Sequence, residues 1–220
     1  PTPLDKILGI DIQYHEKKDE HGRFYDICFS MPDFTRQLVE RYQQVQGAPK
    51  LRRVDSPFVA VAPLDYLKAD HKKTVFQDSA ASLVMAVMYL ARMGRPDTLV
   101  VVTELSTFLT RWSSIADLKL HGLFCYLANT INLGVWGRMR CRGTDDLKLE
   151  AYADANLGGL DTSTRSVTGN LLQITDSLDS RFPLYWTSKR QTATSTSTAE
   201  SELVSLIRLV QDALYPIEGL

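Results

Sequence analysis

Two short stretches decide the fold and the chemistry expected of this chain: Ala151-Tyr152-Ala153-Asp154-Ala155-Asn156 and Ser197-Thr198-Ala199-Glu200-Ser201-Glu202-Leu203. The first is a strand of small residues that carries a carboxylate, and the second opens an apolar helix that carries two more. A strand carboxylate facing a helix carboxylate suits Mg²⁺, which takes oxygen ligands and only one or two protein carboxylates. If the two stretches meet, the sequence predicts a nuclease that cleaves phosphodiesters with two metal ions.

Each of these carboxylates also has a purely structural explanation. A single strand residue such as Asp154 is usually a polar position near a turn, and acidic residues in a first helical turn suit the helix dipole. Glu200 and Glu202 lie two residues apart, on widely separated helix faces, so the two do not address one metal together. Helical periodicity does not choose between them, because they flank the expected buried stripe on opposite sides. That stripe consists of Leu203, Leu206, Ile207, Val210 and Leu214.

The composition is that of an ordinary globular protein. The 220 residues are 44% apolar and 23% charged, and the formal net charge of −1 gives no global argument for nucleic-acid binding. No apolar run reaches transmembrane length, and the first residues do not form a signal peptide. The three cysteines Cys28, Cys125 and Cys141 lack metal-ligand spacing, which favours a reduced intracellular protein. The absence of an initiating Met indicates a piece of a longer chain or a processed product.

Outward from the two stretches, the sequence predicts an α+β protein. Residues 147–155, 166–174 and 182–187 have the composition of strands with turn signals between them, and a helix over 200–214 follows. At the other end of the chain, residues 8–14 and 24–29 are β-rich and flank a charged, Gly-containing tip. The sequence therefore predicts an N-terminal β-hairpin and a C-terminal sheet with one helix.

The middle of the chain has helical periodicity. A helix begins near Met31-Pro32-Asp33 and ends before Gly47, and a long loop over 48–73 is either functional or a mobile connector. Three helices over 74–93, 97–110 and 114–130 then form a bundle whose apolar residues serve as a core. The predicted fold is thus a hairpin, a central helical bundle and a C-terminal mixed sheet.

Three arginines alternate in the segment between the bundle and the last strands. If this segment is extended, Arg138, Arg140 and Arg142 lie on one face. They then form either a stripe that faces the phosphates of a nucleic acid or a charged edge that protects the strand from aggregation. The sequence leaves these two alternatives open.

Several motifs resemble the reverse transcriptase and ribonuclease H region of copia-type LTR retrotransposon polyproteins. In the second half, Tyr152–Asn156 is similar to Y-S-D-A-D, Arg165–Gly169 to R-S-T-S-G, Trp186–Gln191 to W-x-S-K-x-Q, and Ser197–Leu203 to S-S-x-E-A-E-Y. In the first half, Leu8–Ile10 resembles F-L-G-I and Tyr89–Ala91 with Arg95–Asp97 resembles Y-L-A…R-P-D. Leu105–Phe108 and Tyr126–Thr130 resemble L-S-R-F and Y-L-K-G-T.

The resemblance implies a domain organisation and a mechanism. Residues 1–30 would be the tail of a polymerase palm, 31–143 thumb-like and connecting helices, and 145–220 the first part of an incomplete ribonuclease H-like sheet. Asp154 and Glu202 map onto catalytic carboxylates that hold two Mg²⁺ or Mn²⁺ ions, and Glu202 ranks ahead of Glu200. The substrate would be the RNA strand of an RNA–DNA hybrid.

The basic residues would bind that hybrid. Lys189 and Arg190 would meet the duplex backbone, together with the arginine stripe of Arg138, Arg140 and Arg142. Further partners would be the rest of the polyprotein or a protein that pairs with an open sheet edge, and no membrane. The location would be intracellular, in a cytoplasmic virus-like particle or the nucleus.

The match is partial, which leaves a second function class open. No Y-x-D-D polymerase motif is present, and the family's later ribonuclease H carboxylates come beyond the last residue here. Asn156, Leu157 and Leu203 depart from the family pattern. We therefore expect no efficient nuclease activity from this chain alone, and the alternative is a degenerate or host-adopted, non-catalytic binding or assembly module.

Overall fold

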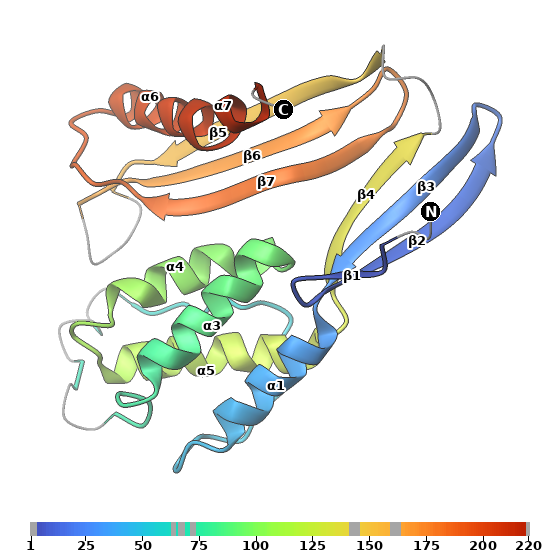
Figure 1. Ribbon diagram of the computed structural model, residues 1–220. Helices are drawn as coiled ribbons and strands as arrows, with labels where there is room; N and C mark the ends of the chain where they lie inside the picture. Colours follow the sequence, from blue (N-terminus) through green and yellow to red (C-terminus); the bar gives the residue numbers. More distant parts are fainter. Residues whose placement is uncertain are drawn as a thin grey trace. The chain divides into compact units, whose positions relative to one another are not determined.

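The computed structural model describes residues 4–62, 65, 69–70, 74–140, 146–158 and 164–218. The chain forms two compact units, one of Pro1–Phe29 with Val135–Leu220 and one of Ser30–Gly134. Figure 1 shows the strands in the first unit and helices α1, α3, α4 and α5 in the second. The predicted α+β class is confirmed. Within the described ranges, no helix combines the length and the apolar character needed to cross a membrane.

The strands of the first unit form one antiparallel sheet. Its order is β1-β2-β3-β4-β7-β6-β5, counting the strands that the structure describes. Their bounds are β1 Lys6–Ile7, β2 Ile10–Asp19, β3 Gly22–Ser30, β4 Gly134–Arg140, β5 Lys148–Asn156, β6 Val167–Thr175 and β7 Arg181–Arg190. The predicted N-terminal hairpin is therefore confirmed as β2 and β3.

The sheet joins segments that are far apart in the sequence. Strand β4, from the predicted middle segment, lies between β3 and β7, so residues from all three predicted segments share one sheet. The division into 1–30, 31–143 and 145–220 stays a prediction, whereas the compact units change over at 29/30 and 134/135. Gly137 of β4 lies so close to the Phe182 ring of β7 that an added Cβ would come within 2.5 Å of it, which explains a glycine there.

One helix covers one face of the β5–β7 part of the sheet. Helix α6, Thr198–Leu209, continues through a π-helical turn, Val210–Leu214, into α7, Tyr215–Glu218. Ser197 caps α6, because its side chain accepts a hydrogen bond from the Glu200 amide. Leu209 and Ala213 pack against Leu172 of β6 and form a small core with Ala153 of β5.

The buried stripe of α6 differs from the prediction. Ser201, Ser205 and Leu209 face the sheet, whereas Leu203, Leu206 and Ile207 are 57%, 50% and 46% exposed. Hydrogen bonding to the sheet explains the difference. Ser205 Oγ donates to the Asp154 carbonyl oxygen over 2.8 Å and lies 2.8 Å from the side-chain amide group of Asn170. Polar contacts therefore help to orient the helix, and three of its large apolar side chains are left in solvent.

The second unit is a helical bundle, as predicted. Its helices are α1 Pro32–Gln43, α3 Ala80–Met93, the 3₁₀ turn η1 Pro96–Thr98, α4 Leu99–Thr107 and α5 Ser114–Asn129. Arg95, only 1% exposed, joins two of them: it pairs with Asp97 and donates to the carbonyl and hydroxyl oxygens of Thr130 over 2.8 and 2.7 Å. A buried guanidinium needs such partners, which explains the Arg-Pro-Asp sequence.

Candidate functional site

The structure places Asp154 and Glu202 on opposite faces of the sheet. Ala153 and Ala155 point toward α6, because they pair across β5 and β6 with the helix-facing Asn170 and Thr168. Side chains alternate along a strand, so Asp154 points to the other face, where it lies opposite Gly169. An added Cβ at Gly169 would meet nothing within 4 Å, so this face is open. The two predicted metal ligands therefore do not converge.

The two helix glutamates have different surroundings. Glu200 accepts hydrogen bonds from the backbone amide and hydroxyl of Thr196, over 2.6 and 2.9 Å, and these bonds lower the pKa of its carboxyl. Glu200 thus completes the helix cap. Glu202 is half-buried on α6. Among the described residues, no group of three or more His, Cys, Asp or Glu is arranged to hold a metal ion. The positions of Asp154 and Glu202 do not fit a pair of Mg²⁺ ions. The catalytic and metal-binding roles expected of these residues stay predictions.

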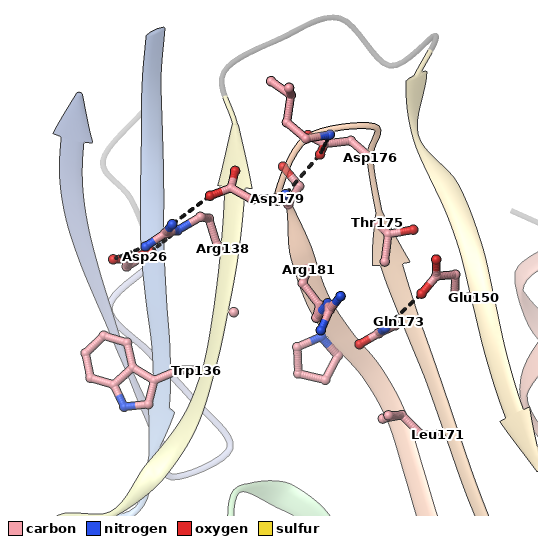
Figure 2. A pocket seen from close by; sticks show the side chains of 14 residues that line it. Asp26, Trp136, Arg138, Glu150, Leu171, Gln173, Thr175, Asp176, Asp179 and Arg181 are labelled. Carbon is pink, nitrogen blue, oxygen red and sulfur yellow. Dashed lines mark hydrogen bonds and ion pairs between the residues drawn. The ribbon is translucent and has the colours of Figure 1, made fainter. Parts of the chain in front are cut away.

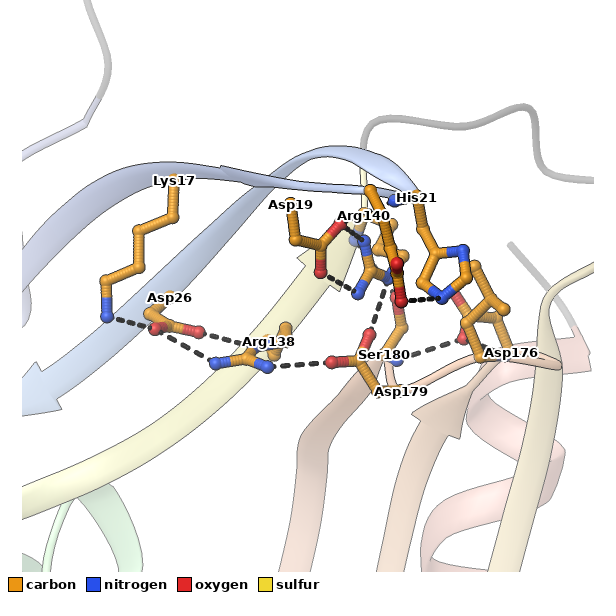
Figure 3. Close-up of polar contacts among 11 residues, drawn as sticks. Lys17, Asp19, His21, Asp26, Arg138, Arg140, Asp176, Asp179 and Ser180 are labelled. Carbon is orange, nitrogen blue, oxygen red and sulfur yellow. Dashed lines mark hydrogen bonds and ion pairs between the residues drawn. The ribbon is translucent and has the colours of Figure 1, made fainter.

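The predicted phosphate-binding arginines pair with carboxylates. Arg138 bridges Asp26 and Asp179, each over 2.7 Å, and Arg140 bridges Asp19 over 2.7 Å and Asp179 over 2.5 Å. Figure 3 shows these contacts, with Lys17 extending the row by a 2.8 Å pair with Asp26. Both guanidinium groups also lie over the Phe24 ring, at 4.3 and 5.2 Å from its centroid. We call Lys17, Asp19, Asp26, Arg138, Arg140 and Asp179 the ion-pair row.

The remaining basic residues do not form one surface in the described part of the chain. Lys189 and Arg190 are successive residues of β7 and point to opposite faces of the sheet. The Arg138 and Arg140 side chains are 36% and 3% exposed. Arg142 lies outside the described residues. A nucleic acid at Arg138 and Arg140 would have to displace carboxylates from both guanidinium groups.

A cavity of about 690 Å³ lies on the face of the sheet opposite α6. Figure 2 shows Trp136 and Arg138 of β4 on one side of it and Glu150, Gln173 and Arg181 on the other. Its polar groups largely satisfy one another: Gln173 Nε2 donates to Glu150 over 3.0 Å, and Arg138 is held in the ion-pair row. Two of the polar side chains that line the cavity, Gln173 and Arg138, are thus already engaged by carboxylates.

Sequence reasoning missed a Cys–His–Tyr cluster in the helical unit. Cys125 Sγ lies 3.4 Å from His121 Nε2, and Tyr42 Oη lies 2.6 Å from His121 Nδ1. The i, i+4 spacing of His121 and Cys125 on α5 was the available signal. Cys125 and Tyr42 are fully buried, and burial lowers the pKa of His121 and raises that of Tyr42. Tyr42 also stacks on Phe124 at 4.5 Å, so this cluster is part of the core.

Strand β5 is largely exposed and lies at one end of the sheet of the first unit. It is the last strand in the sheet order and pairs with β6 along all nine residues, with no bulge. Its other edge is free of any strand that the structure describes. Leu149 and Tyr152 are 47% and 52% exposed, one on each face. A long, regular edge strand that is unpaired on one side and contains no proline is a template for pairing with another chain. These features define an α+β protein whose candidate site is a strand edge.

The comparisons with known proteins identify a family. No protein-family model matches the chain, and no solved structure matches it. Among curated proteins, the chain is similar to secreted RxLR effector protein 161 of Plasmopara viticola. The two are 32% identical over 139 residues, which are 61% of this chain and 88% of that protein. The chain belongs to the family of this effector.

This relationship overturns two expectations. The assignment to a copia-type retrotransposon polyprotein is wrong, because the matched relative is an RxLR effector. The expected intracellular location, cytoplasmic or nuclear, is contradicted by a relative described as secreted. Several residues of the motifs behind the assignment have structural roles in this fold. Ser197 and Glu200 cap α6, Arg95 ties α3 to α5, and Ala153 allows α6 to approach the sheet.

We predict that the first unit loses stability in acid through the ion-pair row. Hydrogen bonds from Arg140 and Arg138 lower the pKa of Asp19 and Asp26, respectively, from 3.8 to about 2. A depressed folded-state pKa stabilises the protein above the unfolded-state value and loses that effect as pH falls through the folded value. The denaturant concentration at the midpoint of unfolding should therefore decrease as the pH is lowered from about 4 to about 2. Asp19→Asn with Asp26→Asn should flatten this fall, and an unchanged slope would contradict the prediction.

We predict that the buried cation of the ion-pair row, Arg140, contributes more to the stability of the fold than the exposed cation, Lys17. Arg140→Met keeps the apolar contact with Phe24 but leaves Asp19 without its guanidinium partner and Asp179 with only Arg138, so it should clearly lower the denaturant concentration at the midpoint of unfolding. Lys17→Met removes a 55% exposed cation and should cost no more than about 1 kcal/mol. Chemical denaturation of both variants checks this. Equal losses of stability in the two variants would contradict the prediction, because burial would then not decide how much each cation contributes.

We predict no hydrolysis of a labelled RNA–DNA hybrid by this chain in Mg²⁺ or Mn²⁺. Asp154 and Glu202 point to different faces and cannot share a pair of ions. The assay compares the chain with Asp154→Asn and Glu202→Gln. Cleavage that both substitutions abolish would contradict the prediction and restore the predicted carboxylate pair.

Proposed function

We propose that this chain is a non-catalytic binding module that pairs a strand of another protein chain with the free edge of β5. The observation that carries the proposal is the regular, nine-residue edge strand Lys148–Asn156. An added strand gains main-chain hydrogen bonds along the edge, and alternate side chains supply specificity. A role as a secreted effector, in the words that describe the relative, is part of the same proposal.

A comparison with the other end of the sheet supports the choice of β5. Strand β1 pairs with only two residues of β2, so much of β2 also has a free edge among the described strands. There the exposed residues include the consecutive charged run Glu16-Lys17-Lys18-Asp19. Charge on both faces of an edge strand opposes pairing. In β5 the charged residues Lys148, Glu150 and Asp154 lie on one face, and the other face carries only Leu149 and three alanines.

The other sequence-based functions stay predictions with less support. Binding and cleavage of an RNA–DNA hybrid with Mg²⁺ require carboxylates that converge and arginines that are accessible. Here the carboxylates diverge, and Arg138 and Arg140 are engaged in the ion-pair row.

Selection of strand-forming peptides tests the proposal. Displayed random nine-residue peptides are selected on the chain, and hydrogen exchange of the complex is then measured. We expect the selected peptides to protect amides of β5 and to leave β2 unchanged. Protection elsewhere, with none at β5, would contradict the proposal.

Two adjacent proline variants provide the matched control. Neighbouring residues point their N–H groups to opposite sides of a strand, so either Ala151→Pro or Tyr152→Pro removes an N–H at the free edge. The other variant removes an N–H that pairs with β6 and should lower the melting temperature. We expect the variant that keeps its melting temperature to lose the selected peptides. Full peptide binding by that variant would argue against strand addition.

A further inference from the structure

The exposed apolar side chains of α6 lie beside the free edge of β5. Val204 and Arg208 face β7, since they line a small pocket with Thr187 and Lys189. Ser201, Ser205 and Leu209 face the sheet. At 100° per residue, Leu206 and Val210 then lie on the flank opposite β7, above the outer side of β5. Leu206 is 50% exposed there. A strand added to β5 would therefore lie under this flank.

The spacing of strands and helices allows a second copy of the chain to pair with this surface. Helix α6 packs on both β5 and β6, through Ala153 and Leu172. Strands lie about 4.8 Å apart, so a two-fold axis beside β5 would lie about one strand spacing from each α6 axis. The two α6 helices would then be about 9.6 Å apart, within the usual range for packed helices of about 8–10 Å. The helix flank that carries Leu206 and Val210 would face the α6 helix of the second copy.

The charges of β5 select one register for such a pair. In an antiparallel pair with its two-fold axis at Ala151, Lys148 lies opposite Asp154 of the second copy, twice by symmetry. Each Glu150 lies opposite Tyr152, and each Leu149 lies opposite Ala153. A register centred on Tyr152 instead would place Glu150 opposite Asp154, which is repulsive. Among the symmetric registers that pair most of β5, only this one forms ion pairs, two by symmetry. Ala151 is aligned with Leu172, which packs on Leu209 and Ala213, so Val210 lies near the axis in this register and each Leu206 faces the C-terminal part of the other helix.

We infer that the strand that pairs with β5 is β5 of a second copy of this chain, in an antiparallel dimer with α6 packed against α6. This inference rests on the proposed function, because it names the partner at the same edge. The dimer covers the exposed Leu206 and closes the free edge in a self-complementary, isologous contact.

Sedimentation velocity of the chain and matched variants tests the dimer. We expect a concentration-dependent dimer, and Leu206→Glu should raise its dissociation constant about tenfold or more. Ile207→Glu is the matched control, since Ile207 is 46% exposed on the same helix but is turned away from the expected axis. It should leave the dissociation constant unchanged. Equal weakening by both variants would overturn the arrangement.

A charge-exchange series tests the register. Lys148→Asp and Asp154→Lys each create two like-charge contacts and should weaken the dimer, whereas the double variant Lys148→Asp/Asp154→Lys should restore it. Melting curves verify that each variant is folded. A double variant that dissociates as readily as the single ones would overturn the register.

The outcomes separate this inference from the proposed function. A wild-type chain that stays monomeric at every concentration, yet binds selected peptides at β5, would overturn the second copy and keep strand addition. A chain that neither dimerises nor binds peptides at β5 would overturn both.

Discussion

The alternation of arginine and aspartate in the ion-pair row is the constraint on which the sheet depends. Strands β4 and β7 share one aligned residue pair, Arg138 with Arg181. Across that junction, Asp179 receives both Arg138 and Arg140, while Asp26 and Asp19 hold the same arginines from the β2–β3 hairpin. Three segments distant in the sequence are thus joined by paired charges over an aromatic ring. Partly buried arginines require such partners, so the row both fixes the sheet and occupies the cations that a phosphate would need.

The orientation of α6 follows from polar contacts in the same unit. Ser205 reaches a strand carbonyl, and Gln191 Nε2 donates to the Ser201 carbonyl over 2.9 Å. These contacts place small residues against the sheet and leave Leu203, Leu206 and Ile207 in solvent. A helix with its larger apolar residues outside is typical of a surface that meets another chain. The free edge of β5 lies on the same side, so one docking event would cover both features.

The geometry, and not the motifs, indicates where the function of this chain is to be sought. Short motifs with small, acidic and basic residues gave a resemblance to a nuclease, yet the same residues serve as caps, close contacts and ion pairs in this fold. The relative is an effector, and the strongest local feature is an edge that offers backbone hydrogen bonds. Binding through main-chain groups demands few particular side chains, which is why motif comparison found no sign of it.

The sequence by itself determined the elements: the hairpin, the three C-terminal strands, the Ser197 cap and the bundle were all predictable from period, turn residues and capping chemistry. The tertiary structure decided which faces meet. Helical period left the rotation of α6 open, because serines that bond to the sheet outweighed the leucine stripe. Strand period placed Asp154 on a face without saying which face α6 would cover. The arginine stripe was visible, but its partners Asp19, Asp26 and Asp179 come from distant segments, and only the packed sheet brings opposite charges within bonding distance.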